Sequence, residues 1–332
     1  MCVHNGEEFL REAVQSILDQ THTDFEFIIV NDASTDQTTR ILLSYDDPRI
    51  RIVNNETNIG LTRSLNKGLR LAKGEFIARM DADDISFNQR FEKQVGFLEQ
   101  HEDIALCGTW VNFNGESTDG PNYPVDAAEI KVAALSYNPF AHPSVMWRRK
   151  VFEDLGLYYD ESFRTSQDYE LWSRALYIVK AANVPIHLLN YRLHTNQVSR
   201  SKEENQKQNS RRIKLGQLKY LQLQPTDKEE RAHLCLFDGQ FDRYREPVVI
   251  KEADEWMDKI VQANRRLGIY EEKLLLKEWR SRFFGSYIYE YNMQVWKIIR
   301  HSSCARLCRA TPRQKLRLLI KCLMGWHAKG GA

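Results

Sequence analysis

Residues 58–84, NIGLTRSLNKGLRLAKGEFIARMDADD, decide the fold because they join a helix, a strand and an acidic turn. LTRSLNKGLRLA has leucines at helical spacing, and Gly74 closes it. EFIARM (75–80) is predicted to be a buried strand, and three aspartates fill four positions directly behind it. Bunched carboxylates repel one another, so local structure formation does not explain them. Either they are solvated in a turn, or a cation binds there.

Strands and helices alternate on both sides of this stretch. The patterns predict helices at 7–19, 35–45 and 88–101, and strands at 25–30, 49–53 and 103–111. Such alternation with short turns is typical of an α/β fold, Rossmann-like, with a mostly parallel sheet covered by helices on both faces. Ligands of these sheets bind outside the carboxyl ends of the strands.

Acidic residues follow two of the predicted strands at that edge, Asp32 after 25–30 and Asp81, Asp83 and Asp84 after 75–80. Asp81 and Asp83 are two positions apart, so in an extended segment they project to the same side. Two converging carboxylates suit Mg²⁺ or Mn²⁺, with substrate phosphate oxygens completing the shell. The competing interpretation is a solvated turn and helix start, where Asp is favoured anyway.

Composition gives weaker indications. A net charge of +2 over 332 residues makes no case for nucleic acid as a partner. Six cysteines have neither metal-site nor disulfide spacing, which fits a reducing compartment. The sequence shows no signal peptide and no apolar run of about 18 residues. We therefore expect a cytoplasmic protein.

With these elements in place, the sequence resembles family 2 of the nucleotide-sugar glycosyltransferases, which are inverting enzymes of the GT-A fold. Five stretches in the family's order, covering roughly residues 2–200, carry the resemblance: VHNGEEFLREAVQSILDQTHTDFEFIIVNDASTDQT (3–38), NIGLTRSLNKGLRLAKGEFIARMDADD (58–84), HPSVMWRRKVFEDLGLYYDESF (142–163), SQDYELWSRAL (166–176) and YRLHTNQVS (191–199). No single stretch is decisive, but the five in order are highly specific. We expect a catalytic domain at 1–204 and a helical extension at 205–332.

The resemblance implies a UDP-sugar donor, a glycan or lipid-linked acceptor, and Mn²⁺ or Mg²⁺ as cofactor. The residues that it assigns to the nucleotide-sugar are Val3, His4, Asp32, Arg63, Asp81 and Arg192. Asp83 would be the direct metal ligand, with Asp81 and His194 beside it. Trp172 and His142 would line the acceptor cleft.

The resemblance also implies that Asp168 is the catalytic base, at the start of a helix under the acceptor. Inverting transfer needs one such group, because the acceptor hydroxyl must lose a proton as it attacks the anomeric carbon. Many relatives have Glu-Asp here, whereas this chain has Gln167-Asp168. The base is kept, and a neighbouring carboxylate is absent.

Each assignment has a structural alternative. Asp32 and Asp168 could serve as helix-terminal acids, and Arg63 could lie on a solvated helix face. Trp172 could pack in the core, and His142 could stabilise a turn. A lone histidine such as His194 is more often structural.

The N-terminus departs from the family. Relatives have an apolar strand directly before the turn, whereas this chain starts Met1-Cys2-Val3-His4-Asn5, so we expect the first strand to be missing and its two neighbours to be unpaired. We interpret this as a lost or misassigned N-terminus. N-terminal mass spectrometry of the native protein tests it, and a native chain that begins at Met1 would exclude a misassigned start.

The C-terminal end is basic. Glu290 is the last acidic residue, and nine Lys or Arg follow it. PRQKLRLLIKCLMGW (312–326) mixes leucines and basic residues at helical spacing, which is typical of a helix on an anionic membrane surface. We therefore expect peripheral association with the inner face of the membrane; the alternative is packing on the catalytic domain. Unchanged liposome binding after deletion of the residues beyond Glu290 would exclude the membrane.

The sequence thus predicts a metal-dependent, inverting glycosyltransferase, of the hexosyl- or N-acetylhexosaminyl-transferase type, in cell-surface polysaccharide biosynthesis. The alternative is a non-catalytic nucleotide-sugar-binding or scaffold protein that kept the fold after losing its first strand.

Overall fold

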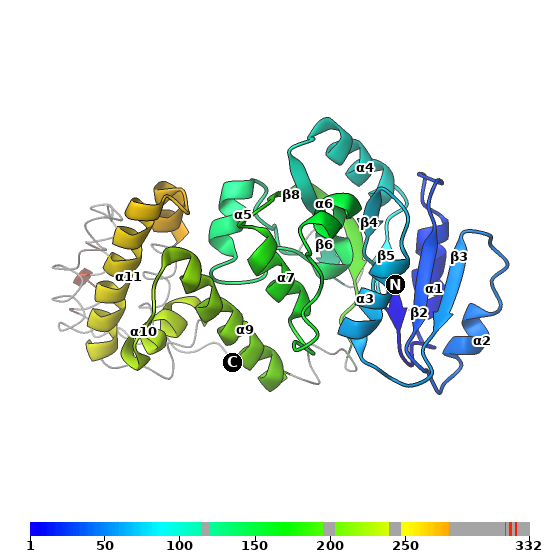
Figure 1. Cartoon of the computed structure of the whole chain (residues 1–332), viewed down its shortest axis with the longest axis horizontal. Helices are drawn as coiled ribbons and strands as arrows, with labels where there is room; N and C mark the ends of the chain where they lie inside the picture. The colour runs from blue at the N-terminus through cyan, green and yellow to red at the C-terminus, as the bar shows by residue number, and fades with distance from the viewer. Residues whose placement is uncertain are drawn as a thin grey trace. The chain divides into compact units, whose positions relative to one another are not determined.

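The structure, a computed structural model, describes residues 1–113, 120–194, 203–238 and 247–278, and also residues 316, 319, 320 and 323. The chain forms two compact units (Figure 1). Unit 1 contains residues 1–130 and 138–209, and unit 2 contains 131–137 and 210–332. The domain boundary predicted at residue 204 falls within helix α9 (Glu203–Gly216).

Unit 1 begins with a three-stranded parallel sheet in the order β1-β2-β3. Its strands are β1 (Cys2–Val3), β2 (Phe27–Asn31) and β3 (Ile50–Asn54). Helices α1 (Leu10–Leu18), α2 (Thr38–Leu42) and α3 (Leu61–Leu71) connect them or follow them. Burial of Leu10, Val14 and Ile17 on one side of α1 explains the periodicity of its sequence.

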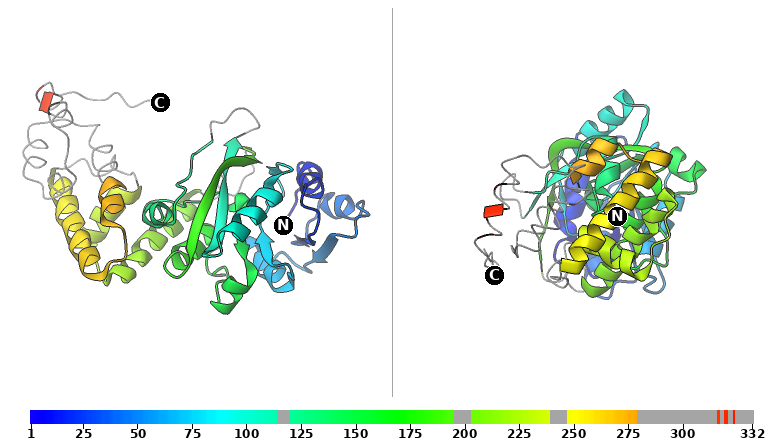
Figure 2. Two further views of the ribbon diagram at one scale, coloured as in Figure 1. Left: turned by 90° about the horizontal axis from the view of Figure 1, so that it is seen from above. Right: turned by 90° about the vertical axis from the view of Figure 1, so that its left-hand side faces the viewer.

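A five-stranded sheet follows in the order β4-β7-β6-β8-β5. Its strands are β4 (Phe76–Ala78), β5 (Ile85–Ser86), β6 (Ile104–Phe113), β7 (Met146–Arg148) and β8 (Lys180–Tyr191). β6 and β8 pair in parallel, and the other pairs are antiparallel. Helices α4 (Arg90–Gln100), α6 (Arg149–Asp154) and α7 (Gln167–Ala175) and the short turn η1 (His142–Ser144) complete this part (Figure 2). Helix α5 (Ala127–Ala133) contributes residues 127–130 to unit 1 and residues 131–133 to unit 2. The predicted α/β alternation is confirmed.

The prediction that the first strand is missing is wrong in part, because Cys2 and Val3 form β1 and pair with Val30 and Asn31. The backbone N–H groups of Val30 and Asp32 donate to the carbonyls of Met1 and Val3 at 2.9 and 2.8 Å. β1 nevertheless ends one sheet and β4 ends the other. A cavity of about 600 Å³ lies beside these strands, and its lining includes Met1, Phe27, Ile28, Leu69, Phe76 and Ala78.

The cavity and the position of Met1 let us predict how residues added before Met1 will change the stability of the fold. The amino nitrogen of Met1 donates to the carbonyl of Ile28 at 3.0 Å, so residues placed before Met1 would continue β1 along β2. Each buried Val or Ile contributes about 1.5–3 kcal/mol. We expect an added Val/Ile-rich pentapeptide to raise the free energy of unfolding by about 2 kcal/mol or more in urea denaturation. A Gly/Ser pentapeptide is the control; equal stability of the two would contradict the prediction.

Unit 2 has a helical core in its described residues. It includes η2 (Gln217–Leu221), α10 (Asp227–Asp238) and α11 (Pro247–Leu267), and α10 and α11 lie side by side (Figure 2). The indole N–H of Trp256 donates to Nδ1 of His233 at 3.2 Å. Burial lowers the pKa of His233 to about 3, so this histidine is a neutral core residue.

Within the described part of the chain, we find no helix that has both the length and the apolar character needed to cross a membrane.

Candidate active site

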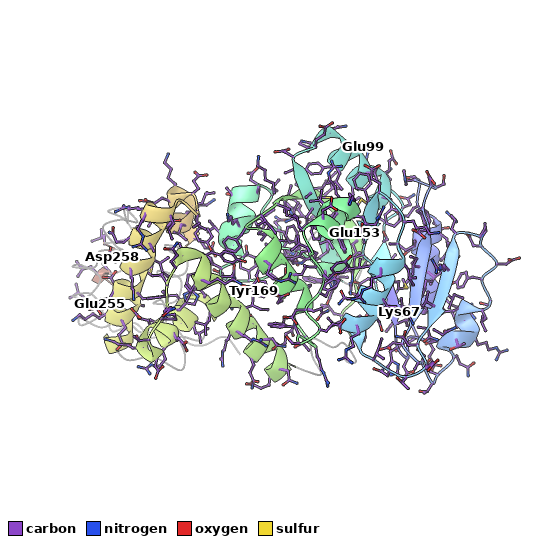
Figure 3. All side chains as sticks on the ribbon, in the orientation of Figure 1. Lys67, Glu99, Glu153, Tyr169, Glu255 and Asp258 are labelled. Atoms are coloured by element: carbon purple, nitrogen blue, oxygen red, sulfur yellow. The ribbon has the colours of Figure 1, made fainter. Side chains whose placement is uncertain are left out.

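Four elements of unit 1 carry, at or next to one of their ends, polar side chains that the sequence singled out. β2 is followed by Asp32, and β4 by the segment Asp81–Asp84. α7 contributes Asp168 in its first turn, and β8 is followed by Arg192 and His194. Tyr169, labelled on α7 in Figure 3, is the residue directly after Asp168.

Hydrogen bonds fix the acidic segment at both of its ends. Before it, the N–H of Arg79 donates to the carbonyl of Val145 at 3.0 Å, and the buried Arg90 donates to the carbonyl of Arg79 at 3.1 Å. After it, the N–H of Arg192 donates to Oδ1 of Asp84 at 2.9 Å. These bonds hold the turn against β7 on one side and the end of β8 on the other.

Asp81, Asp83 and Asp84 each offer a carboxylate oxygen, and these oxygens lie within 4.8 Å of one another. Asp81 forms an ion pair with the buried guanidinium of Arg79. Burial raises the pKa of Asp81; Arg79 opposes this rise, whereas the charges of Asp83 and Asp168 add to it. Burial and the charges of Asp81 and Asp83 raise the pKa of Asp84 well above its ordinary value. Burial and mutual repulsion therefore oppose the ionised forms of Asp81 and Asp84.

His194, which the resemblance assigned to the metal, lies beside the cluster. Its Nε2 lies 3.0 Å from Oδ2 of Asp83, and its ring packs on Phe9 of the turn before α1, with centroids 4.8 Å apart. Carboxylate oxygens and an imidazole nitrogen are ligands that Mn²⁺ accepts.

Asp84 gives an independent test of whether a cation fits. Its side chain is 1% exposed, and among the described residues its Oδ2 has no hydrogen-bond partner. A buried carboxylate oxygen without a partner is costly. Together with the partly exposed oxygens of Asp81 and Asp83, it makes a donor set that fits Mg²⁺ or Mn²⁺.

Asp168 is positioned by α7 and by a side chain that the sequence analysis did not single out. The amide of Asn138 donates to Oδ2 of Asp168 at 2.6 Å. Burial raises the pKa of Asp168, against the opposing effects of the Tyr169 N–H, the charge of Arg79 and the Asn138 amide. A raised pKa is what a general base needs to accept a proton near neutral pH. The charge of Asp168 also raises the pKa of Asp81, so the two carboxyl groups interact electrostatically.

Asp32 is almost fully buried, at 3% exposure, and its carboxylate binds the loop before α3. Oδ1 accepts the Asn55 amide at 2.8 Å and the Ile59 N–H at 2.9 Å, and Oδ2 accepts the Gly60 N–H at 2.9 Å. Gly60, at φ +89°, is the N-cap of α3. Asp32 thus fixes the loop that leads into α3.

The remaining nucleotide candidates differ in exposure. Val3 is a buried strand residue, so only its backbone can reach a ligand. His4 is exposed, and its Nδ1 lies 2.8 Å from the carbonyl of Asp32. Arg63 is 59% exposed and pairs with Glu161 at 3.3 Å. Arg192 pairs with Glu12 and lies over the Phe9 ring, 4.9 Å from its centroid. The side chains of Arg63 and Arg192 thus already have acidic partners.

The acceptor assignment of Trp172 is wrong, because this side chain is fully buried. Its ring contacts Phe140, Trp147 and Phe152 edge-on, at centroid distances of 5.9–6.4 Å. His142 is half-buried in η1, and its Nε2 lies 2.8 Å from the hydroxyl of Tyr159. Burial lowers the pKa of His142 well below its usual value, so it is neutral.

Sequence reasoning missed Arg79 and Asn138 as parts of the site. Arg79 lay inside the quoted stretch, and a charged residue within a predicted buried strand was a signal that it needed a partner. Asn138 contacts a residue 30 positions away, and its own sequence neighbourhood gave no signal for that contact.

Comparison with known proteins places these observations in context. The model of glycosyl transferase family 2 matches residues 1–156. An uncharacterized glycosyltransferase of Haemophilus influenzae is 34% identical over 233 residues, covering 66% of this chain and 72% of that protein. The O-antigen biosynthesis glycosyltransferase WbnJ of Escherichia coli is 35% identical, over 60% of this chain and 81% of WbnJ.

Solved structures show the same fold. S. aureus TarS 1–349 in complex with UDP-GlcNAc matches with a TM-score of 0.57 and 18% identity, covering 86% of this chain and 87% of TarS 1–349. The complex of the same fragment with UDP matches with a TM-score of 0.55. At this identity the likeness establishes the fold only.

Proposed function

Because this chain belongs to glycosyltransferase family 2 and is a glycosyltransferase, we propose that it transfers a hexosyl or N-acetylhexosaminyl group from a UDP-sugar to a hydroxyl group, with inversion and with the help of a divalent cation. One observation carries the proposal. One carboxylate oxygen each of Asp81, Asp83 and Asp84 lies within 4.8 Å of the others, and Nε2 of His194 lies 3.0 Å from Asp83, so these residues form a candidate metal site. The solved complexes of TarS with UDP and UDP-GlcNAc support the choice of donor.

In this proposal Asp168 acts as the base. Its carboxylate takes the proton of the acceptor hydroxyl while that oxygen forms a bond to the anomeric carbon. The bond from the anomeric carbon to the diphosphate oxygen breaks, and UDP leaves with the electron pair. A single displacement without an enzyme nucleophile inverts the anomeric configuration. Burial of Asp168 raises its pKa and so strengthens it as a base.

Asp83, Asp81 and His194 would hold Mn²⁺ or Mg²⁺, and Asp84 would supply a further carboxylate oxygen. When bound, the cation neutralises charge that develops on the departing diphosphate. Arg79 stays paired with Asp81 and lowers the net charge of the cluster before anything binds. The contact of His194 with Asp83 supports its place in the donor set.

Asp32 would accept the N–H of the uracil ring. An ionised carboxylate offers about four lone-pair sites, and three N–H donors already use three of them. One acceptor site therefore remains for the base, beside the exposed His4. Arg63 and Arg192 would reach the nucleotide only by exchanging their acidic partners for phosphate.

The acceptor would be a glycan or a lipid-linked glycan in cell-surface polysaccharide biosynthesis, with His142 at its cleft. The name of WbnJ supports this class.

An anionic membrane surface would bind the C-terminal end. Leu316, Ile320 and Leu323 are helical, exposed and spaced to share one helix face. The rest of the predicted helix at 312–326, apart from residue 319, lies outside the described residues, and the liposome measurement tests this part.

A thermal-shift panel tests the donor. A ligand that binds only the folded protein raises its melting temperature. We expect one UDP-sugar with Mn²⁺ to raise the melting temperature more than the same sugar nucleotide with EDTA, and ADP- and GDP-sugars to have little effect. Equal shifts with all three nucleotides would contradict the uracil contact and the choice of donor.

A further inference from the structure

Both the nitrogen and the oxygen of the Asn138 side-chain amide form hydrogen bonds. Its Nδ2 donates to Asp168 at 2.6 Å, and its Oδ1 accepts the N–H of Phe140 at 3.3 Å. The second bond decides which way the amide faces, since a flipped amide would turn its oxygen toward a carboxylate and its NH₂ toward an N–H donor. The NH₂ group therefore points at Asp168.

The backbone around Asn138 is equally constrained. Pro139 restricts the preceding residue to extended conformations, and its carbonyl accepts the amide of the buried Asn183 at 3.1 Å. The buried Phe140 packs edge-on against Trp172 of α7, the helix that carries Asp168. The same core contact thus sets the distance between the segment containing Asn138 and the helix containing Asp168.

We infer that Asn138 is a positioning residue of the reaction, whose amide holds the Asp168 carboxylate in the single orientation from which it accepts the proton. This inference rests on the proposed role of Asp168. Asn138 does not touch the reacting atoms and acts through Asp168.

The groups around Asp168 determine how its pKa will change when the Asn138 amide is removed. Burial raises the pKa of Asp168, while Arg79 at the end of β4, the Tyr169 N–H and Asn138 oppose that rise. The charge of Asp168 also raises the pKa of Asp81 and of Tyr159, so both groups interact with it electrostatically. Replacing Asn138 by Leu keeps the size of the side chain and removes the donor. The pKa of Asp168 then rises further, because the donor that favours its charged form is gone.

Kinetics of Asn138→Leu test the inference. We expect kcat to fall at least tenfold with the donor KM within twofold of wild type, and the acidic limb of the pH profile to move to higher pH. In an Asp168→Asn background the same substitution should have no further effect on kcat. A change of less than twofold in kcat, or an equal loss in both backgrounds, would overturn the inference. Asn138→Ala is the second variant if Asn138→Leu does not fold.

A measurement without substrate separates this inference from the proposed function. The Asp168 carboxyl is titrated by ¹³C NMR in wild type and in both Asn138 variants, with Asp168→Asn used to assign the signal. A higher pKa in the variants supports the inference even if no donor sugar is ever transferred. An unchanged pKa overturns it, whatever the activity.

Discussion

Asp168→Asn should reduce sugar transfer about 10²–10⁴-fold, the range by which a positioned base accelerates proton transfer. The amide cannot accept the proton, yet its carbonyl oxygen can still accept the bond from Asn138. We therefore expect the donor KM and the fold to be preserved while kcat falls. Steady-state kinetics with the UDP-sugar identified by thermal shift measure kcat and the donor KM.

The same variant should be more stable than wild type at neutral pH. The folded-state pKa of Asp168 is raised above its unfolded value, so the ionised side chain destabilises the folded state. This penalty is complete above the folded-state pKa and disappears as the pH falls to the unfolded value of about 3.9. The melting temperature of Asp168→Asn should exceed that of wild type at pH 7, and the difference should vanish near pH 4.

Asp154→Asn is the matched control for both measurements. Asp154 ends α6, and its side chain is 59% exposed and paired only with Lys150 among the bonds that we identify. It should change neither kcat nor the melting temperature appreciably, because exposed pairs contribute little. Wild-type activity in Asp168→Asn would contradict the assignment of the base.

Asp83→Asn should weaken Mn²⁺ binding at least tenfold and lower transfer about 10²-fold or more at fixed metal concentration. The substitution keeps the size of the side chain and removes one negative charge from the donor set beside His194. Raising the Mn²⁺ concentration should recover part of the activity, in contrast to Asp168→Asn. Metal titrations followed by activity and by calorimetry distinguish the two variants.

Asp103→Asn controls for the loss of one carboxylate. Asp103 is 63% exposed and pairs at 3.0 Å with Lys180 at the start of β8, whereas the acidic cluster contacts Arg192 directly after the end of β8. It should leave the metal dependence unchanged. An unaltered Mn²⁺ requirement in Asp83→Asn would mean that the cluster does not hold the cation.

Local sequence patterns were sufficient for the α/β fold and for the position of Asp81 and Asp83 behind a strand, whereas the assignment of His194 came from the family resemblance. Strand and helix periodicities depend on burial of one face, which the chain encodes locally. Carboxylates directly after a strand are placed by the strand itself, so their position at the sheet edge could be predicted.

Other features depend on distant neighbours and could not be predicted. Trp172 has the same helical spacing whether it faces a ligand or the core, and only packing against Phe140 and Trp147 decides it. The partners of Asn138 and Arg192 are 30 and 180 positions away. β1 has only two residues, too few for an alternation pattern, and it forms because β2 offers a free edge.

Release of UDP from a UDP-sugar by the purified chain, with Mn²⁺ and with EDTA, tests the proposed activity most directly. The geometry of Asp83, His194 and Asp168 predicts release that requires the divalent cation and is lost in Asp83→Asn and Asp168→Asn. A folded protein that releases UDP equally well in EDTA, or that releases none from any UDP-sugar, would contradict metal-dependent transfer at this site.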